Sequence, residues 1–184
     1  MNSFSFLGLS QTAHLVIPKG HLEGVTSVCC SPNGKYIFSG SRDHTAKVWS
    51  THGLEIETFE LNHEVLSVAF SPDEKNVAIG CADGKINVFN LNGQLVLKVD
   101  AHRNGINSLF FSPNGKSILS GSSDHTAKLW NTNGQLLNTF THKKAINSVS
   151  FSSDGKFILT GSDDSTAVVW DLSGKKLSHL IGHK

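Results

Sequence analysis

The stretch SGSSDHTAKLW, residues 120–130, recurs along this chain in four versions. An aromatic residue closes each version, and the four are 40, 41 and 40 residues apart: Trp49, Phe89, Trp130 and Trp170. An aspartate stands six residues before each aromatic: Asp43, Asp83, Asp124 and Asp164. A fixed period near forty, filled with short apolar runs, is typical of a repeat architecture in which small sheets stack on one another.

The third copy, residues 102–140, shows how one repeat is expected to fold. Its first segment, around Ile106 and Leu109, alternates apolar and small polar residues as a half-buried strand does. Asn114-Gly115 supplies a tight turn. Three further strands are expected at residues 117–121, 126–130 and 135–140. Because every connection is short, neighbouring strands should be antiparallel, and the repeats must stack to bury both faces.

Gly20-His21, Asp43, Trp49 and the pair Trp170-Asp171 resemble the WD-repeat β-propeller family. The resemblance covers residues 11–184 and leaves residues 1–10 as an N-terminal tail. It implies an all-β fold whose blades are four-stranded antiparallel sheets, with four WD repeats visible as part of a larger ring. The expected repeats span about residues 20–60, 61–100, 101–141 and 142–182.

In that family each blade carries a hydrogen-bonded tetrad of His, Ser or Thr, Asp and Trp. Carried over by position, the structural tetrads are His21, Ser39, Asp43, Trp49; His102, Ser120, Asp124, Trp130; and His142, Thr160, Asp164, Trp170. A buried indole N–H needs an acceptor, which the hydroxyl provides.

The second copy departs from this pattern at three tetrad positions. Phe89, Ile79 and Leu61 replace the tryptophan, the hydroxyl and the histidine, and Glu74 replaces a turn glycine. Replacing every partner with apolar groups can be nearly neutral, whereas leaving one buried partner alone costs about 1–3 kcal/mol. The second blade is therefore expected to exchange its polar network for packing.

The number of strands does not match the number of repeats. Residues 13–18 resemble a fourth strand, as do residues 55–60, 94–99, 135–140 and 176–181, so five outer strands accompany four inner triplets. Either the chain is a piece of a longer propeller, or it is a half-ring that completes itself as a homodimer. A closed ring of four blades is the third alternative.

The leading functional hypothesis is a non-catalytic protein–protein interaction scaffold or adaptor, not an enzyme. The three His/Ser/Asp sets leave a hydrolase as the runner-up, but they recur at structural positions, each with a tryptophan. A regulatory module of a larger signalling protein is the other alternative. No catalytic residue, metal site or cofactor is predicted, because no His/Cys/Asp group shows ligand spacing.

Proteins or peptides are the expected partners. In WD-repeat propellers partners commonly dock where the chain enters the first strand and at the turn before the tetrad aspartate. The corresponding residues are Arg42, Thr26, Glu64, Leu66, Asn107, Asn147 and Asp163. Arginine is favoured at binding hot spots, so Arg42 is the strongest candidate.

Composition suggests further exclusions. The formal net charge is +1 and the sixteen Lys and Arg residues are dispersed, so no nucleic-acid partner is expected. No segment approaches the roughly 20 apolar residues of a membrane span, and the first residues lack the pattern of a secretory signal. We therefore expect a cytoplasmic protein with no membrane association and no small-molecule ligand.

Overall fold

The computed structural model describes residues 20–182, which form four blades of four strands each. Blade 1 contains β1 (Val25–Cys30), β2 (Tyr36–Ser41), β3 (Thr45–Ser50) and β4 (Glu55–Glu60), and blade 2 contains β5 (Val65–Phe70), β6 (Asn76–Cys81), β7 (Lys85–Asn90) and β8 (Leu95–Asp100). Blade 3 contains β9 (Ile106–Phe111), β10 (Ser117–Ser122), β11 (Thr126–Asn131) and β12 (Leu136–Thr141), and blade 4 contains β13 (Ile146–Phe151), β14 (Phe157–Ser162), β15 (Thr166–Asp171) and β16 (Lys176–Ile181). Within these residues no helix is long and apolar enough to cross a bilayer.

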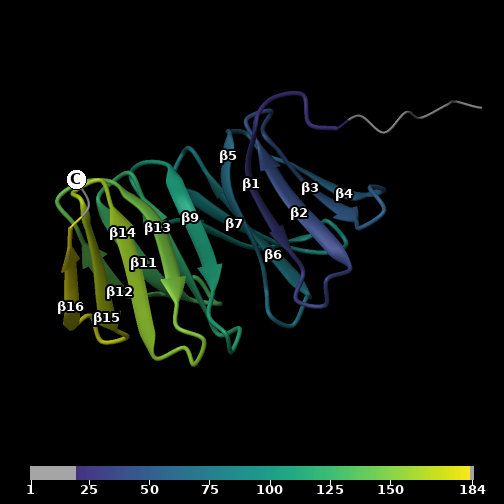
Figure 1. The fold of residues 1–184 in the computed structure, drawn as a ribbon. Helices are drawn as coiled ribbons and strands as arrows, with labels where there is room; N and C mark the ends of the chain where they lie inside the picture. The colour runs from purple at the N-terminus through teal and green to yellow at the C-terminus, as the bar shows by residue number, and fades with distance from the viewer. Residues whose placement is uncertain (1–19, 183–184) are drawn as a thin grey trace, which may run out of the picture.

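Each blade is an antiparallel meander in which the strands pair in chain order. The blades stand side by side in an arc, from blade 1 at the purple end to blade 4 at the yellow end, and the ring is not closed (Figure 1). The first strands β1, β5, β9 and β13 contact one another in turn, so they line the inner side of the arc. The prediction of an all-β array of propeller blades is confirmed.

The turn between the first two strands of each blade is organised by a serine. In blade 1 the Ser31 Oγ accepts a hydrogen bond from the Tyr36 amide at 3.0 Å, and Gly34 takes a φ of 68°. Glu74, which replaces this glycine in blade 2, takes a φ of 60°, a conformation that is unfavourable for a residue with a Cβ. Its carboxylate accepts the Asn33 amide of blade 1 at 2.5 Å, a contact between blades that a glycine could not make.

The hydrophobic core lies between blades. Phe38 of blade 1 contacts Phe70 of blade 2, with ring centroids 5.5 Å apart, and Phe59 contacts Phe89 at 5.0 Å. Two further clusters join blade 2 to blade 3 and blade 3 to blade 4. Each blade therefore obtains its burial from its neighbours, as expected for a repeat array.

Two outer strands begin one residue later than the sequence pattern suggested. The expected segments 94–99 and 135–140 appear as β8 and β12, because Gln94 and Gln135 close the preceding turns. The Asn90 amide donates to the Gln94 carbonyl, and the Asn131 amide donates to the Gln135 carbonyl, both at 2.9 Å. The expected outer strand at residues 13–18 and the tail at residues 1–10 lie outside the described residues.

Candidate functional site

The tetrad side chains of blade 3 are in mutual hydrogen-bond contact. Trp130 Nε1, on β11, donates to Ser120 Oγ on β10 at 3.0 Å. Ser120 Oγ lies 2.7 Å from His102 Nε2, and His102 Nδ1 lies 2.9 Å from the carboxylate of Asp124. The indole uses the hydroxyl as an acceptor, and the hydroxyl hydrogen is donated to Nε2 at 2.7 Å, which is a closer acceptor than the Lys128 carbonyl at 3.3 Å. The imidazole is then neutral, with its proton on Nδ1 facing the carboxylate.

Blades 1 and 4 bring the other eight tetrad residues together in the same way. In blade 1, Trp49 Nε1 donates to Ser39 Oγ at 2.8 Å, and His21 joins Ser39 at 2.7 Å and Asp43 at 3.1 Å. In blade 4, the corresponding distances are 2.8 Å for Trp170 to Thr160, 2.7 Å for His142 to Thr160 and 3.1 Å for His142 to Asp164.

A fifth side chain, absent from the sequence-based set, completes each network. Thr45 Oγ1 donates to Asp43 at 2.7 Å, and Thr126 and Thr166 repeat this bond to their aspartates at 2.6 Å. The signal was present in the sequence, because a threonine follows the tetrad aspartate by two residues in the three copies that keep the tetrad, whereas Lys85 stands there in blade 2.

These bonds determine the ionisation of the network. Burial would raise the pKa of Asp124, but hydrogen bonds from Thr126 and the Arg103 amide, together with the charge and hydrogen bond of His102, lower it to about 2. Burial lowers the pKa of His102 below its ordinary value, against the opposing attraction of Asp124. At neutral pH the pair is therefore a carboxylate hydrogen-bonded to a neutral imidazole.

The same geometry argues against a hydrolytic nucleophile. Ser120 is 0% exposed, and the indole occupies its oxygen. Burial also raises the pKa of the Cys29 thiol to about 11 and that of Cys81 to about 12, so neither is a thiolate at neutral pH. Within residues 20–182 no three His, Cys, Asp or Glu side chains are grouped as metal ligands.

Blade 2 has packing in place of the tetrad. Ile79 is fully buried, and Leu61 and Phe89 pack against the same cluster. Asp83 keeps the tetrad position but pairs with Lys85 Nζ at 2.7 Å. A cavity of about 200 Å³ opens beside this pair, and His63 reaches Asp83 at 3.7 Å.

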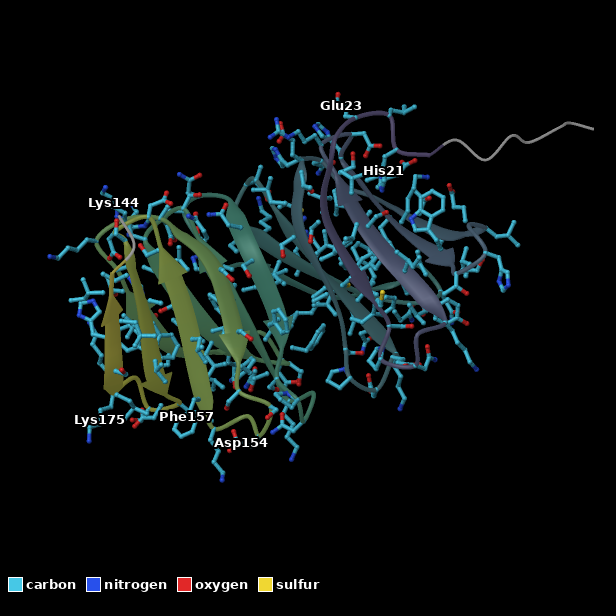
Figure 2. The ribbon with its side chains drawn as sticks, viewed as in Figure 1. His21, Glu23, Lys144, Asp154, Phe157 and Lys175 are labelled. Atoms are coloured by element: carbon cyan, nitrogen blue, oxygen red, sulfur yellow. The ribbon has the colours of Figure 1, made fainter. Side chains whose placement is uncertain are left out.

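The residues proposed for partner binding lie along one edge of the blades, which we call the loop edge: the loops that lead into β1, β5, β9 and β13 and the turns that lead into β3, β7, β11 and β15. Figure 2 shows this edge at Glu23 and Lys144, with Asp154 and Lys175 at the opposite edge. Arg42 and Asp163 are exposed on the loop edge, and Glu64 is half-buried.

Three of the candidate residues serve contacts between blades. Thr26 Oγ1 donates to the Val65 carbonyl of blade 2 at 2.5 Å, and Asn107 Nδ2 donates to the Ile146 carbonyl of blade 4 at 2.9 Å. Leu66 packs at Gly105, where an added Cβ would lie 2.8 Å from Leu66 Cδ1. Asn147 instead donates to the carboxylate of Asp163 within blade 4. Among the candidate residues, Arg42 and Glu64 are therefore more available for contact with a partner, because their side chains take no part in these contacts.

Three exposed cations on the loop edge were missed in the sequence. Arg103 follows His102, and Lys143 and Lys144 follow His142, so all three project from adjacent loops of blades 3 and 4. Within residues 20–182 none of them forms a salt bridge. Their position directly after a tetrad histidine was the available signal.

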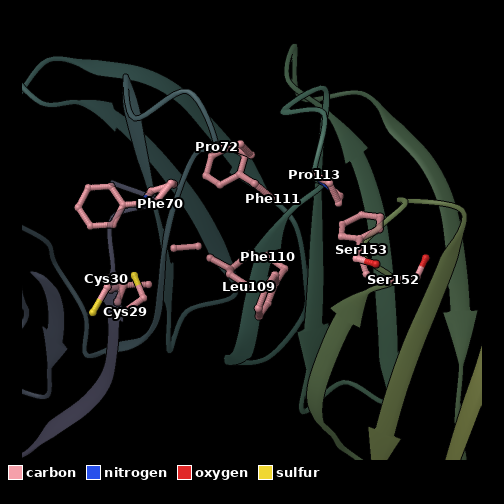
Figure 3. A pocket seen from close by; sticks show the side chains of 14 residues that line it. Cys29, Cys30, Phe70, Pro72, Leu109, Phe110, Phe111, Pro113, Ser152 and Ser153 are labelled. Atoms are coloured by element: carbon pink, nitrogen blue, oxygen red, sulfur yellow. The ribbon is translucent and has the colours of Figure 1, made fainter. Parts of the chain in front are cut away.

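An apolar groove lies at the other end of the first strands. It encloses about 450 Å³, and Phe70, Phe110 and Phe111 line it together with Pro72 and Pro113 (Figure 3). Ser152 and Ser153 are its hydroxyl-bearing residues and Cys29 and Cys30 its thiols. This lining holds no acid–base pair and supports binding rather than catalysis.

Comparison with known proteins agrees with the blade geometry. The chain matches the family described as "WD domain, G-beta repeat" over residues 12–50, 55–90, 93–131 and 134–171, which is well over half of its length. This chain belongs to the WD-repeat family. The matched repeats are offset from the blades by one strand, since residues 55–90 hold β4 of blade 1 together with β5, β6 and β7 of blade 2. The resemblance inferred from the sequence is confirmed.

Several curated WD-repeat relatives resemble part of this chain. It is 38% identical over 78 residues to Ribosomal RNA-processing protein 9 of Saccharomyces cerevisiae, covering 40% of the chain and 14% of that protein. It is 39% identical over 80 residues to the Periodic tryptophan protein 2 homolog of Caenorhabditis elegans, covering 43% and 9%. It is 33% identical over 75 residues to the U3 small nucleolar RNA-associated protein 15 homolog of Xenopus laevis, covering 40% and 15%. The matched segments thus span a small part of these relatives.

The WD repeats and these relatives confirm the scaffold prediction and correct two others. We expected no nucleic-acid partner and a cytoplasmic location. Both expectations are contradicted by relatives named for ribosomal RNA processing and for association with a small nucleolar RNA. The argument against a nucleic-acid partner failed because it used the net charge of the whole chain. A local group of cations is sufficient for contact with RNA, and a protein contact is sufficient for membership of an RNA-containing particle.

Proposed function

We propose that this WD-repeat chain is a non-catalytic docking module of an RNA-processing ribonucleoprotein particle. The observation that carries the proposal is the group of exposed cations Arg103, Lys143 and Lys144 on the loop edge. Phosphate contacts from Arg and Lys supply much of the affinity of proteins for nucleic acid. The names of the relatives favour RNA over other phosphate-bearing partners.

The same edge offers a protein-binding site in blades 1 and 2. Arg42 and Glu64 carry opposite charges there, and Arg42 can form bidentate bonds with a carboxylate. Asp163, whose carboxylate accepts a hydrogen bond from Asn147, adds a negative charge on blade 4. Thr26, Leu66 and Asn107 then act by holding the blades that present these side chains, because their contacts run between blades.

The absence of catalysis belongs to the same proposal. A buried hydroxyl that already accepts an indole N–H cannot approach a substrate carbonyl without breaking the tetrad. An ester and peptide panel should therefore show no hydrolysis that disappears in folded Asp124→Ala protein. Hydrolysis lost in that variant would refute this part of the proposal.

The RNA-particle proposal can be tested by co-purification. The tagged full chain is incubated with a nuclear extract, and precursor ribosomal RNA and U3 RNA are quantified in the eluate against transfer RNA. We expect enrichment of the first two that falls at least tenfold when Arg103, Lys143 and Lys144 are all changed to Glu. Strong salt dependence should accompany the binding.

A matched control reverses three cations at the opposite edge, with Lys116, Lys156 and Lys175 changed to Glu. This control has the same net charge as the loop-edge variant, so equal losses in both would show that only net charge matters. Enrichment no greater than that of transfer RNA in the unaltered chain would overturn the proposed function.

A further inference from the structure

The polar cavity of about 200 Å³ lies in blade 2, where the tetrad is missing. In blades 1 and 3 a lysine of the third strand, Lys47 or Lys128, holds its Nζ 5.7 Å from the centre of the tetrad tryptophan ring. The equivalent lysine and tryptophan positions of blade 2 are occupied by Asn87 and Phe89, which line the cavity. Both are smaller than the residues they replace, so blade 2 leaves this space open.

Asn87 is a buried polar side chain that lines this cavity. It is 6% exposed, and within residues 20–182 its side-chain amide makes one hydrogen bond, from Nδ2 to Cys81 Sγ at 3.6 Å. One N–H and the carbonyl oxygen of the amide are therefore left for another group. Because a buried polar group without a partner costs free energy, a ligand that supplies both a donor and an acceptor here is favoured.

Charged side chains of both signs surround this amide. Asp83 and Lys85 Nζ are paired at 2.7 Å, and Glu60 and Lys98 add one charge of each sign to the lining. Among the described residues neither Glu60 nor Lys98 takes part in a salt bridge. A cationic ligand would meet two ammonium groups, and an anionic ligand would meet two carboxylates. The lining therefore favours a neutral group that carries both donors and acceptors.

The size and the apolar part of the lining narrow the class of ligand further. A volume of about 200 Å³ is below the roughly 300–1,000 Å³ of pockets for drug-sized ligands, so the cavity takes a group the size of one side chain or one nucleobase. Phe89 and Leu95 supply apolar surface. A base combines a flat apolar face with an edge of donors and acceptors, and single-stranded RNA presents such bases to proteins.

The cavity lies next to the loop that carries Arg103. Asp83 and Lys85 flank Gly84, whose carbonyl accepts the His102 amide of blade 3 at 2.9 Å. Arg103 follows His102 and is one of the three exposed cations proposed to contact RNA. An RNA strand held at its phosphates by Arg103 therefore runs close to the cavity.

We propose that the cavity of blade 2 binds one unpaired base of the RNA, preferentially guanine. Guanine matches the Asp83–Lys85 pair, because its Watson–Crick edge places N–H donors for a carboxylate beside an oxygen that accepts from an ammonium. Asn87 contacts the same edge, and the ring lies against Phe89. The inference rests on the proposed RNA contact of the loop edge and adds a base preference, which phosphate contacts alone do not provide.

The test measures binding of two labelled single-stranded RNA octamers to the full chain by fluorescence anisotropy. One contains only uridines and the other has one central guanosine among uridines, so the two carry the same phosphates. The guanosine octamer should bind about tenfold more tightly, as expected for one good set of base contacts. Asn87→Leu keeps the side chain near its size but removes its donors and acceptors. This variant should lose the preference and bind the uridine octamer almost as before.

A second pair of variants avoids the buried position. Leu95 and Leu136 begin β8 and β12 and are 52% and 49% exposed, and of the two it is Leu95 that lines the cavity. Leu95→Glu should remove the guanosine preference, whereas Leu136→Glu, with the same change of charge, should keep it. Equal affinity of the unaltered chain for the two octamers would overturn the inference, as would a preference that survives in Asn87→Leu.

Failure of this inference and failure of the proposed function give different results. Uridine octamer binding that is lost when Arg103, Lys143 and Lys144 are changed to Glu, with no guanosine preference, would refute the base site and leave the proposed function standing. No binding of either octamer would refute the RNA contact itself. If the octamers bind equally and a protein from nuclear extract is lost in Leu95→Glu but not in Leu136→Glu, the cavity takes a protein side chain and the base site is refuted.

Discussion

Changing Trp130 to Phe should lower the free energy of unfolding by about 1–3 kcal/mol, the cost of leaving a buried hydrogen-bonding group without its partner. The indole N–H donates to Ser120 Oγ at 3.0 Å, and both residues are buried, with exposed fractions of 6% and 0%. Water cannot take the place of the lost donor at such a site. The smaller ring also leaves unfilled volume beside Ser120, which adds to the loss.

The effect is large enough to measure in a chain of this length. One kcal/mol corresponds to roughly 2–4 °C in Tm for domains of 150–250 residues, so a shift of about 2–12 °C is expected. Urea unfolding followed by far-UV circular dichroism gives the free energy directly. Tryptophan fluorescence is unsuitable, because the substitution removes one of the reporters.

Two control variants separate the hydrogen bond from the ring. Phe89→Trp in blade 2 should bring no gain, because Ile79 and Leu61 provide no acceptor for the new N–H. Trp49→Phe should cost less than Trp130→Phe, because Trp49 is only half-buried. If Trp130→Phe and Phe89→Trp change the urea midpoint equally, the tetrad does not act through its hydrogen bonds and the reasoning is wrong.

Three further predictions concern acid, partner contact and the blade turns. Because burial holds the pKa of His102 below 6.5, the unfolded chain takes up a proton at this histidine before the folded chain does. Stability should therefore be full above about pH 6.5 and should fall as the pH drops below that value. In melting experiments, the loss of stability between about pH 7 and pH 5.5 should be smaller in a folded His102→Gln protein. Arg42→Ala should weaken a protein partner captured on the loop edge by about 1–3 kcal/mol, more than Ser123→Ala does, and titration calorimetry giving equal losses would contradict the assignment. Gly84→Ala should destabilise the chain more than Gly53→Ala, although the two glycines have nearly equal φ values of 79° and 80°. A Cβ added at Gly84 would lie 2.2 Å from the His102 carbonyl oxygen, whereas a Cβ added at Gly53 would meet nothing within 4 Å. Equal Tm values for the two variants would refute this prediction.

Much of the fold could be predicted from spacing because the repeat is local. A turn serine, a glycine and a strand of six residues are specified within a few positions of one another, and four copies in register leave little freedom. The tetrad residues could be listed for the same reason, although Thr126 was overlooked. A threonine two residues after the aspartate was visible in the three copies that keep the tetrad, but only the structure shows that its hydroxyl donates to the carboxylate of Asp124.

The docking residues were harder to predict, because the same position serves different purposes in different blades. Thr26 and Asn107 look like surface polar residues in the sequence, and the structure uses both as donors to the next blade. Lys143 and Lys144 are consecutive in the sequence but far along the chain from Arg103, and the three cations come onto one edge only when the blades place their loops side by side.

Val25 and Val65 show what could not be predicted from the sequence alone. Both are valines at the first position of the first strand of a blade, and nothing in the local sequence separates them. The repeat pattern is sufficient to place both valines on the same side of the strand. Only the stacked blades decide that Val65 is 0% exposed and Val25 is 53% exposed, because the burial of a blade comes from the blade beside it and not from its own residues.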